Sequence, residues 1–225
     1  MTAPALAAAT EAPDQVERNY RLVAAIVKPV LRVWFRTRVE GAGHIPAEGG
    51  AILVANHCSN ADPLLAALAT GRPVYYMSKA ELFKGPFGVV LHAIGQFPVR
   101  RGGADREALQ AAAALIERGD VLGLFPEGTR GTGGFDVAHP GLAWLVLHTA
   151  APVIPVALVG SDRIRRPLGW LPFASPVRLV VGPPLDVPAP AAGRTARREA
   201  TEQLRVTLQE FMTGARDGAD RRSGR

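Results

Sequence analysis

His57 and Asp62 lie five positions apart in the stretch NHCSNAD (56–62), and this pair of residue types could do acid–base chemistry. On one helix, side chains with this spacing diverge by roughly 140°. A turn from a strand into a helix can instead bring them together. A carboxylate then holds the imidazole in one tautomer, ready to act as a general base. A satisfied turn histidine without catalytic function is the simpler interpretation of the pair taken alone.

The segments on either side of this pair predict such a turn. The apolar run 50–54 is typical of a buried strand, and residues 64–69 are typical of the first turns of a helix. We therefore expect His57 where a strand ends and Asp62 at or near the start of a helix.

Three other chemistries find less support in this stretch. A zinc site needs closely spaced His or Cys ligands, whereas the other histidines are scattered, so no metal is predicted. A carboxylesterase needs a Gly-x-Ser-x-Gly turn, which the sequence lacks. Cys58 is badly placed to act as a nucleophile, because the base that would activate it is its immediate neighbour along the chain.

A second polar stretch, FPEGTR (125–130), also follows an apolar run. Gly128 lets the backbone approach a ligand closely, and Thr129 and Arg130 offer a hydroxyl and a guanidinium suited to phosphate. In isolation, the stretch is typical of a turn with a surface arginine.

Helical and strand patterns alternate along the chain, which predicts a single α/β domain with a mostly parallel central sheet flanked by helices. The expected strands are 50–54, 73–77, 121–125, 153–160 and 178–181, with a short strand in 39–49 and an extended piece over 95–101. The expected helices are 64–69, 105–118, 142–149 and 197–213, with a helical or broken helical segment over 81–94. We divide the chain into a flexible tail (1–14), an amphipathic helix (15–38), an α/β core (39–187), a connector with a closing helix (188–213) and a flexible basic tail (214–225).

The candidate residues gather at the expected strand ends. Lys79, Arg101 and the stretch 125–130 each lie at or just past such an end, as His57 does. Ligands of parallel sheets bind beyond the carboxyl ends of the strands. Each basic residue alone is typical of a solvated loop, but together they predict an oxyanionic substrate held beside a base.

The stretch 15–38 has one apolar and one basic face. The apolar residues at helical spacing are Val23, Ile26, Val27, Val30 and Trp34, and the basic ones are Arg21, Lys28, Arg32 and Arg36. Pro29 is expected to kink or break this helix. Two interpretations stay open: a helix packed on the core with a solvated basic side, or a helix lying in the plane of an anionic membrane.

Composition narrows the class of partner. The 225 residues suffice for one domain with a sizeable core, and the net charge of +6 favours an anionic partner. Aromatic residues are only 6% of the chain and no nucleic-acid-binding motif is present, so we predict no nucleic-acid partner. The single cysteine fits a reducing compartment, and no transmembrane segment or secretory signal is expected. We therefore expect a peripheral protein on the cytoplasmic face of the cell membrane.

Four blocks of the chain, in this order, resemble the glycerolipid acyltransferases of the lysophosphatidic acid acyltransferase type. The resemblance covers roughly residues 50–160. Its blocks are Asn56-His57-x4-Asp62, Phe97-Pro98-Val99-Arg100-Arg101, Phe125-Pro126-Glu127-Gly128-Thr129-Arg130 and Val153-Ile154-Pro155-Val156-Ala157-Leu158. The first and third blocks together are highly specific to the family.

This resemblance implies a role for each matching residue. His57 is the base for a glycerol hydroxyl, Asp62 orients it, and Pro155 is associated with the acyl side of the site. The residues associated with the phosphate of the acceptor are Arg101, Glu127, Gly128, Thr129 and Arg130, and Lys79 is our further candidate for that phosphate. No metal or other cofactor is implied, because the acyl thioester, acyl-CoA or acyl carrier protein, is a co-substrate.

We therefore expect an acyltransferase acting on the free hydroxyl of a lysophospholipid, giving phosphatidic acid from 1-acylglycerol 3-phosphate. Two departures concern the acceptor: Arg100 stands where many relatives carry Asp, and 139–141 where many carry Lys. They leave glycerol 3-phosphate, a lyso-aminolipid and a glycolipid open as acceptors. A non-catalytic lipid-binding module is the alternative from another class, although such a module needs no base.

Overall fold

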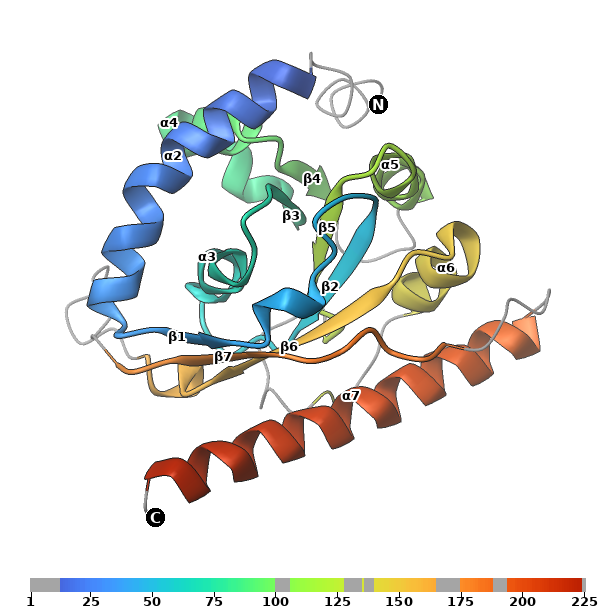
Figure 1. Cartoon of the computed structure of the whole chain (residues 1–225). Coiled ribbons are helices and arrows are strands. Elements are labelled where there is room, and N and C mark those ends of the chain that lie inside the picture. Colours follow the sequence, from blue (N-terminus) through green and yellow to red (C-terminus); the bar gives the residue numbers. More distant parts are fainter. Residues whose placement is uncertain are drawn as a thin grey trace.

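The computed structural model describes residues 13–99, 106–127, 135, 140–164, 175–187 and 194–223. Within these residues, seven strands form one sheet in the order β1-β7-β6-β2-β5-β3-β4 (Figure 1). The strands are β1 (Arg38–Glu40), β2 (Ala51–Ala55), β3 (Val74–Lys79), β4 (Phe97–Val99), β5 (Val121–Leu124), β6 (Val153–Val159) and β7 (Arg178–Val181).

The direction of the strands decides which ends meet. Strands β6, β2, β5, β3 and β4 are parallel to one another, so their carboxyl ends lie together at what we call the carboxyl edge. Strand β7 is antiparallel to β6, and β1 is parallel to β7. Strand β2 lies between β6 and β5 and all its residues are buried, as expected for a continuous apolar run inside a parallel sheet. The predicted α/β domain with a mostly parallel sheet is confirmed.

Helices cover both faces of the sheet (Figure 1). They are α2 (Pro13–Trp34), α3 (Asp62–Ala66), α4 (Gly85–Ala93), α5 (Arg106–Glu117), α6 (Pro140–Thr149) and α7 (Arg194–Ser223), with 3-10 turns η1 (Ala42–His44), η2 (Ala67–Ala69), η3 (Ala80–Phe83) and η4 (Ser161–Arg163). Helices α5, α6 and α7 bury apolar side chains against one face. Helix α3, turn η2 and the end of α2 pack against the other.

The expected amphipathic helix near the N-terminus is present as α2, and of the two outcomes expected at Pro29 the structure shows the kink and not the break. The helix continues through Pro29, and Figure 1 shows a bent helix rather than a broken one. It ends at Trp34 because Arg36 adopts a left-handed φ of 42° and the N–H of Thr37 donates back to the carbonyl of Arg32 at 3.0 Å. None of the described helices is long and apolar enough to cross a membrane.

The C-terminal helix is longer than the sequence suggested. Residues 214–223, expected as part of a flexible tail, belong to α7. Met212 and Ala215 are buried on the same side of the helix as Leu204 and Leu208, so contact with the sheet face continues beyond residue 213. Residues 1–12 of the predicted N-terminal tail and 188–193 of the predicted connector lie outside the described residues.

Candidate active site

A buried asparagine fixes the point where the chain leaves strand β2. Asn56 is 1% exposed, and its Oδ1 accepts the N–H of Leu158 in β6 at 2.7 Å. The side-chain amide of Asn56 donates to the carbonyl of Leu158 at 3.4 Å. The side chain of Asn56 thus makes the hydrogen bonds to β6 that a backbone peptide group would make if β2 continued by one residue. It holds the next residue, His57, at the carboxyl edge.

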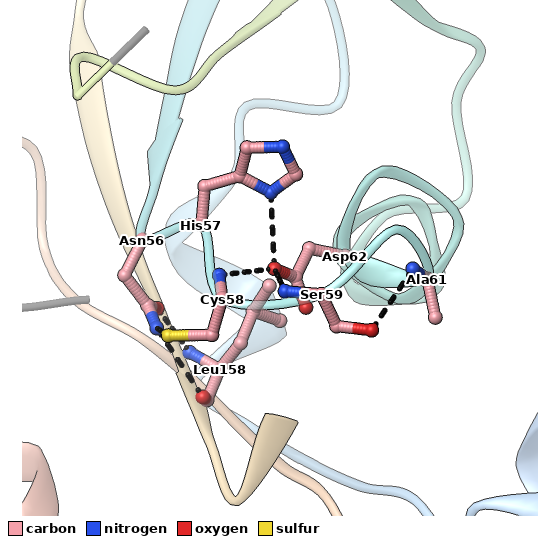
Figure 2. A network of polar contacts seen from close by, with 7 residues as sticks. All are labelled: Asn56, His57, Cys58, Ser59, Ala61, Asp62 and Leu158. Carbon is pink, nitrogen blue, oxygen red and sulfur yellow. Dashed lines mark hydrogen bonds and ion pairs between the residues drawn. The ribbon is translucent and has the colours of Figure 1, made fainter. Parts of the chain in front are cut away.

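The structure brings His57 and Asp62 together, as the strand-to-helix turn predicted. Nδ1 of His57 lies 3.1 Å from Oδ2 of Asp62, the first residue of α3 (Figure 2). The same oxygen accepts the backbone N–H groups of Cys58 and Ser59, each at 2.6 Å. Asp62 is fully buried, so these three donors hold its carboxylate in one place against the imidazole.

This contact sets the tautomer of the imidazole. A carboxylate only accepts hydrogen bonds, so in the neutral imidazole of His57 this contact assigns the proton to Nδ1 and the lone pair to Nε2. Figure 2 shows Nε2 pointing away from Asp62. The side chain of His57 is 15% exposed. The arrangement therefore presents a proton acceptor, backed by a buried carboxylate, at the carboxyl edge of the sheet.

One aromatic ring stacks on the imidazole and a second ring stacks on the first, and the sequence indicated neither contact. The ring of Phe125 stacks on that of His57, with centroids 4.4 Å apart and planes 29° apart. Phe125 in turn stacks on Tyr76 of β3, with centroids 5.7 Å apart and planes 14° apart. Burial raises the pKa of Tyr76 well above its ordinary value, so its phenol stays neutral. Phe125 belongs to the FPEGTR stretch, but nothing in its spacing indicated this contact.

Cys58 is a poor nucleophile in this setting. Burial first, and then the negative charge of Asp62, raises the pKa of its thiol, and a contact from the amide of Asn56 opposes the shift. The amide nitrogen of Asn56 lies 3.8 Å from the sulfur. The thiolate, which is the reactive form, is therefore disfavoured at neutral pH.

Glu127 and Lys79 are two further predicted site residues whose positions the structure describes. Oε1 of Glu127 accepts the N–H of Phe135 at 2.9 Å, so this carboxylate ties together two parts of the segment after β5. Lys79 is the last residue of β3, at the carboxyl edge, and its side chain is exposed.

Pro155 is not brought next to His57. It is buried within β6 opposite Val54 of β2, and its carbonyl accepts the N–H of Gly182 at 2.9 Å. A Cβ at Gly182 would lie 2.8 Å from Cγ of Pro155 and 2.5 Å from the ring of Phe211, which places Pro155 on the face covered by α7. Its association with the acyl side stays a prediction.

The remaining candidates for binding phosphate, Arg101, Gly128, Thr129 and Arg130, lie outside the described residues. The strands that precede them, β4 and β5, both end at the carboxyl edge, as β2 does. Among the described residues, no group of three or more His, Cys, Asp or Glu side chains is arranged to hold a metal ion.

The fold and the site together are a mostly parallel α/β sheet with a His–Asp pair at its carboxyl edge. The chain belongs to the Acyltransferase family, whose family model matches residues 36–159. The matched region includes His57 and Asp62 and extends through β6.

Two similar proteins are 1-acyl-sn-glycerol-3-phosphate acyltransferases. The chain is 26% identical over 170 residues to a 1-acyl-sn-glycerol-3-phosphate acyltransferase of Bacillus subtilis, covering 74% of this chain and 82% of that protein. It is 32% identical over 132 residues to one of Borreliella burgdorferi, covering 55% of this chain and 51% of that protein. An uncharacterized protein of Mycobacterium tuberculosis is 26% identical over 234 residues, covering 84% of this chain, and the chain spans only 65% of its length.

A solved structure shares the fold. The crystal structure of the 1-acyl-sn-glycerophosphate acyltransferase of Thermotoga maritima superimposes with a TM-score of 0.63 and 23% sequence identity. The match covers 92% of this chain and 87% of that chain.

Proposed function

We propose that this protein transfers an acyl chain from an acyl thioester to the free hydroxyl of a lysophospholipid, with His57 as the general base. The observation that carries the proposal is the contact between Nδ1 of His57 and the buried carboxylate of Asp62, which leaves Nε2 free to accept a proton. Family membership supports the reaction class.

The proposed reaction needs no covalent intermediate on the enzyme. Nε2 of His57 removes the proton of the hydroxyl while the hydroxyl oxygen attacks the carbonyl carbon of the thioester. Asp62 stabilises the positive charge that the imidazole acquires. The carbon–sulfur bond then breaks, and the departing thiolate takes the proton back from His57. The products are the ester and the free thiol.

The acceptor we favour is 1-acylglycerol 3-phosphate, which would give phosphatidic acid. The relatives from Bacillus subtilis and Borreliella burgdorferi, both 1-acyl-sn-glycerol-3-phosphate acyltransferases, support this choice. Arg101, Arg130 and Lys79 are our candidates for holding its phosphate, with Thr129 and the backbone at Gly128. Glycerol 3-phosphate, a lyso-aminolipid or a glycolipid remains the alternative acceptor, and either acyl-CoA or acyl carrier protein could supply the acyl chain.

We further propose that the carboxyl edge faces an anionic membrane. Helix α2 exposes an apolar stripe to solvent, which consists of Leu22, Ile26, Val30 and Val33. Arg18, Arg21 and Arg32 are exposed on the neighbouring side of the helix. Exposed aliphatic side chains beside basic ones are the features of a helix that lies in a lipid interface.

The end of α2 lies at the same edge as His57. Arg38, four residues beyond the helix, pairs with Arg178, which in turn pairs with Val159 at the end of β6. Further exposed apolar side chains follow strand ends at this edge, namely Leu64 in α3, Leu82 in η3 and Phe87 in α4. A membrane meeting these side chains would bring a lipid acceptor close to the base.

The proposal is tested by measuring thiol release from palmitoyl-CoA by the purified protein, with and without 1-acylglycerol 3-phosphate. Release that requires the lysolipid, together with formation of phosphatidic acid, is the expected result. Release without any acceptor would identify a thioesterase and contradict the proposal. If neither acyl-CoA nor acylated carrier protein reacts with any of the acceptors named above, the proposed reaction is contradicted and a lipid-binding module is the candidate to test next.

A further inference from the structure

We propose that Phe125, Tyr76 and Gly123 form a positioning column that fixes the plane of the His57 imidazole. The inference rests on the proposed function, in which His57 is the base, and it assigns a part of the site that neither the family match nor the motif explains.

The contact with Asp62 does not by itself define the orientation of the imidazole. The ring turns about its Cβ–Cγ bond, and a single hydrogen bond of 3.1 Å restrains this rotation only in part, so the ring can still tilt away from Asp62. Proton transfer requires Nε2 to aim at the hydroxyl, so this rotation has to be limited. The ring of Phe125, stacked at 4.4 Å, closes one face of the imidazole and limits it.

The stack also favours the protonated state that forms during the reaction. The face of an aromatic ring attracts a cation whose charge lies within about 6 Å of the ring centroid. The imidazolium formed when His57 accepts a proton meets this condition over Phe125. Phe125 therefore stabilises the same charged form that Asp62 stabilises, from a different direction.

Tyr76 supports Phe125 from within the sheet. Its ring stacks on Phe125, and its side chain is only 7% exposed. Its backbone N–H donates to Oε1 of the buried Gln96 at 2.8 Å, which holds this part of β3 in place. The hydroxyl of Tyr76 is buried and has no hydrogen-bond partner among the described residues. The support that Tyr76 gives to Phe125 therefore comes from its ring and not from its hydroxyl.

Gly123 leaves the space that the ring of Tyr76 occupies. It lies opposite Tyr76 in the register of β5 and β3. A Cβ at position 123 would lie 2.1 Å from Cε1 and 2.6 Å from Cζ of Tyr76, closer than real contacts allow. Gly123 has strand geometry and no positive φ, so the requirement for glycine here comes from the ring and not from the backbone. Any larger residue would displace Tyr76, and Phe125 with it.

The test compares variants of the full chain by two readouts. Phe125→Leu removes the stacked ring, Gly123→Ala displaces Tyr76, and Tyr76→Phe conserves the ring. Phe83→Leu is the control, because Phe83 contacts a different histidine, His92, with ring centroids 4.7 Å apart and planes tilted by 55°.

The first readout is the NMR signal of the imidazole Nδ1–H of His57, identified by its loss in His57→Ala. We expect it to be sharp in the wild type, in Tyr76→Phe and in Phe83→Leu. We expect it to broaden or disappear in Phe125→Leu and Gly123→Ala, because the ring turns away from Asp62. The second readout is turnover, where kcat should fall about 10- to 100-fold in those two variants while KM changes less than about threefold.

Unchanged His57 signals and unchanged kcat in Phe125→Leu would overturn the positioning column. Phe125→Leu decides the matter alone if Gly123→Ala does not fold. The NMR readout needs no substrate, so it separates the two proposals. A wild type that transfers no acyl chain contradicts the proposed function, while the response of the His57 signal still tests the column.

Discussion

At the scale of single residues, one oxygen of Asp62 organises the candidate site. It meets the imidazole of His57 and two backbone N–H groups in the same turn, and it is shielded from water. The turn therefore folds around the carboxylate, and the base acquires its tautomer as a result. A buried carboxylate that accepts three hydrogen bonds is stronger support for a functional His57–Asp62 pair than the spacing of the two residues in the sequence.

Cys58 gives a prediction about pH. Burial and the Asp62 carboxylate raise the pKa of its thiol, so at any given pH below that pKa the folded protein holds less thiolate than the unfolded chain. Alkylation by iodoacetamide at pH 8 should be at least about tenfold slower in the folded protein than in urea. The rate in the folded protein should still be rising above pH 9.

Alkylation is simple to follow because Cys58 is the only cysteine in the chain. The urea-unfolded protein serves as the control. Equal rates in the folded and unfolded protein at pH 8 would show that the thiol is not shielded in the way the structure indicates.

At the scale of elements, side-chain amides next to strands make hydrogen bonds to the backbone of a neighbouring strand. The amide of Asn56 continues the pairing of β2 with β6, and that of Gln96 bonds to the N–H of Tyr76 and the carbonyl of Val74 in β3. The first holds the turn that carries His57. The second holds the strand that carries Tyr76.

Arg72 does similar work at the opposite edge of the sheet. Its guanidinium donates to the carbonyls of Pro46 at 3.0 Å, Gly49 at 2.8 Å, and Gly119. It thereby joins the loop before β2 to the turn before β5. Arg72→Met should lower the free energy of unfolding by about 2–4 kcal/mol, because charged donors to backbone carbonyls are among the stronger hydrogen bonds.

Urea unfolding measures this loss directly. Arg72→Lys, which keeps the charge but not the fork of donors, should fall between the wild type and Arg72→Met. Arg163→Met, at an exposed position in η4, should change stability by less than about 0.5 kcal/mol. Equal stabilities of Arg72→Met and Arg163→Met would contradict the role given to Arg72.

Local patterns predicted the elements well, and contacts between elements poorly. The strand 178–181 and the helix 105–118 were found nearly to the residue, because apolar runs and helical periodicity are local properties. The spacing of Phe125 and Tyr76 in the sequence did not indicate their ring contact, because the two side chains meet only after β5 and β3 pair. The extent of α7 was missed because the glycines and arginines after residue 213 are typical of a tail.

At the scale of the whole molecule, helix periodicity left open which side of α2 meets the core. The structure turns Val23 and Val27 partly inward and leaves Ile26 and Val33 71% and 80% exposed. The exposed stripe therefore differs from the face that the sequence grouped together. One face of α2 therefore packs on the core and another is exposed, and contact of the exposed face with a membrane stays a proposal.

The proposed membrane contact predicts the effect of charges on that stripe. The double variant Ile26→Asp/Val33→Asp should bind vesicles containing phosphatidylglycerol at least about tenfold more weakly than the wild type, because two aliphatic side chains no longer enter the lipid. Cosedimentation with vesicles measures this. Neither position is buried, so the fold should be retained.

Val206→Asp is the matched control, since Val206 is exposed on α7, away from α2 (Figure 1). It should bind vesicles as the wild type does. Equal losses in the two variants, or none in the double variant, would contradict a membrane face formed by α2.

The central claim is that His57 is the base for acyl transfer, and its most direct test is the turnover of His57→Ala. Acceptor-dependent thiol release should fall about 10³-fold or more, with urea unfolding close to that of the wild type. His148→Ala, which removes an exposed histidine on α6, should keep wild-type turnover. Turnover of a folded His57→Ala within about tenfold of the wild type would contradict the account.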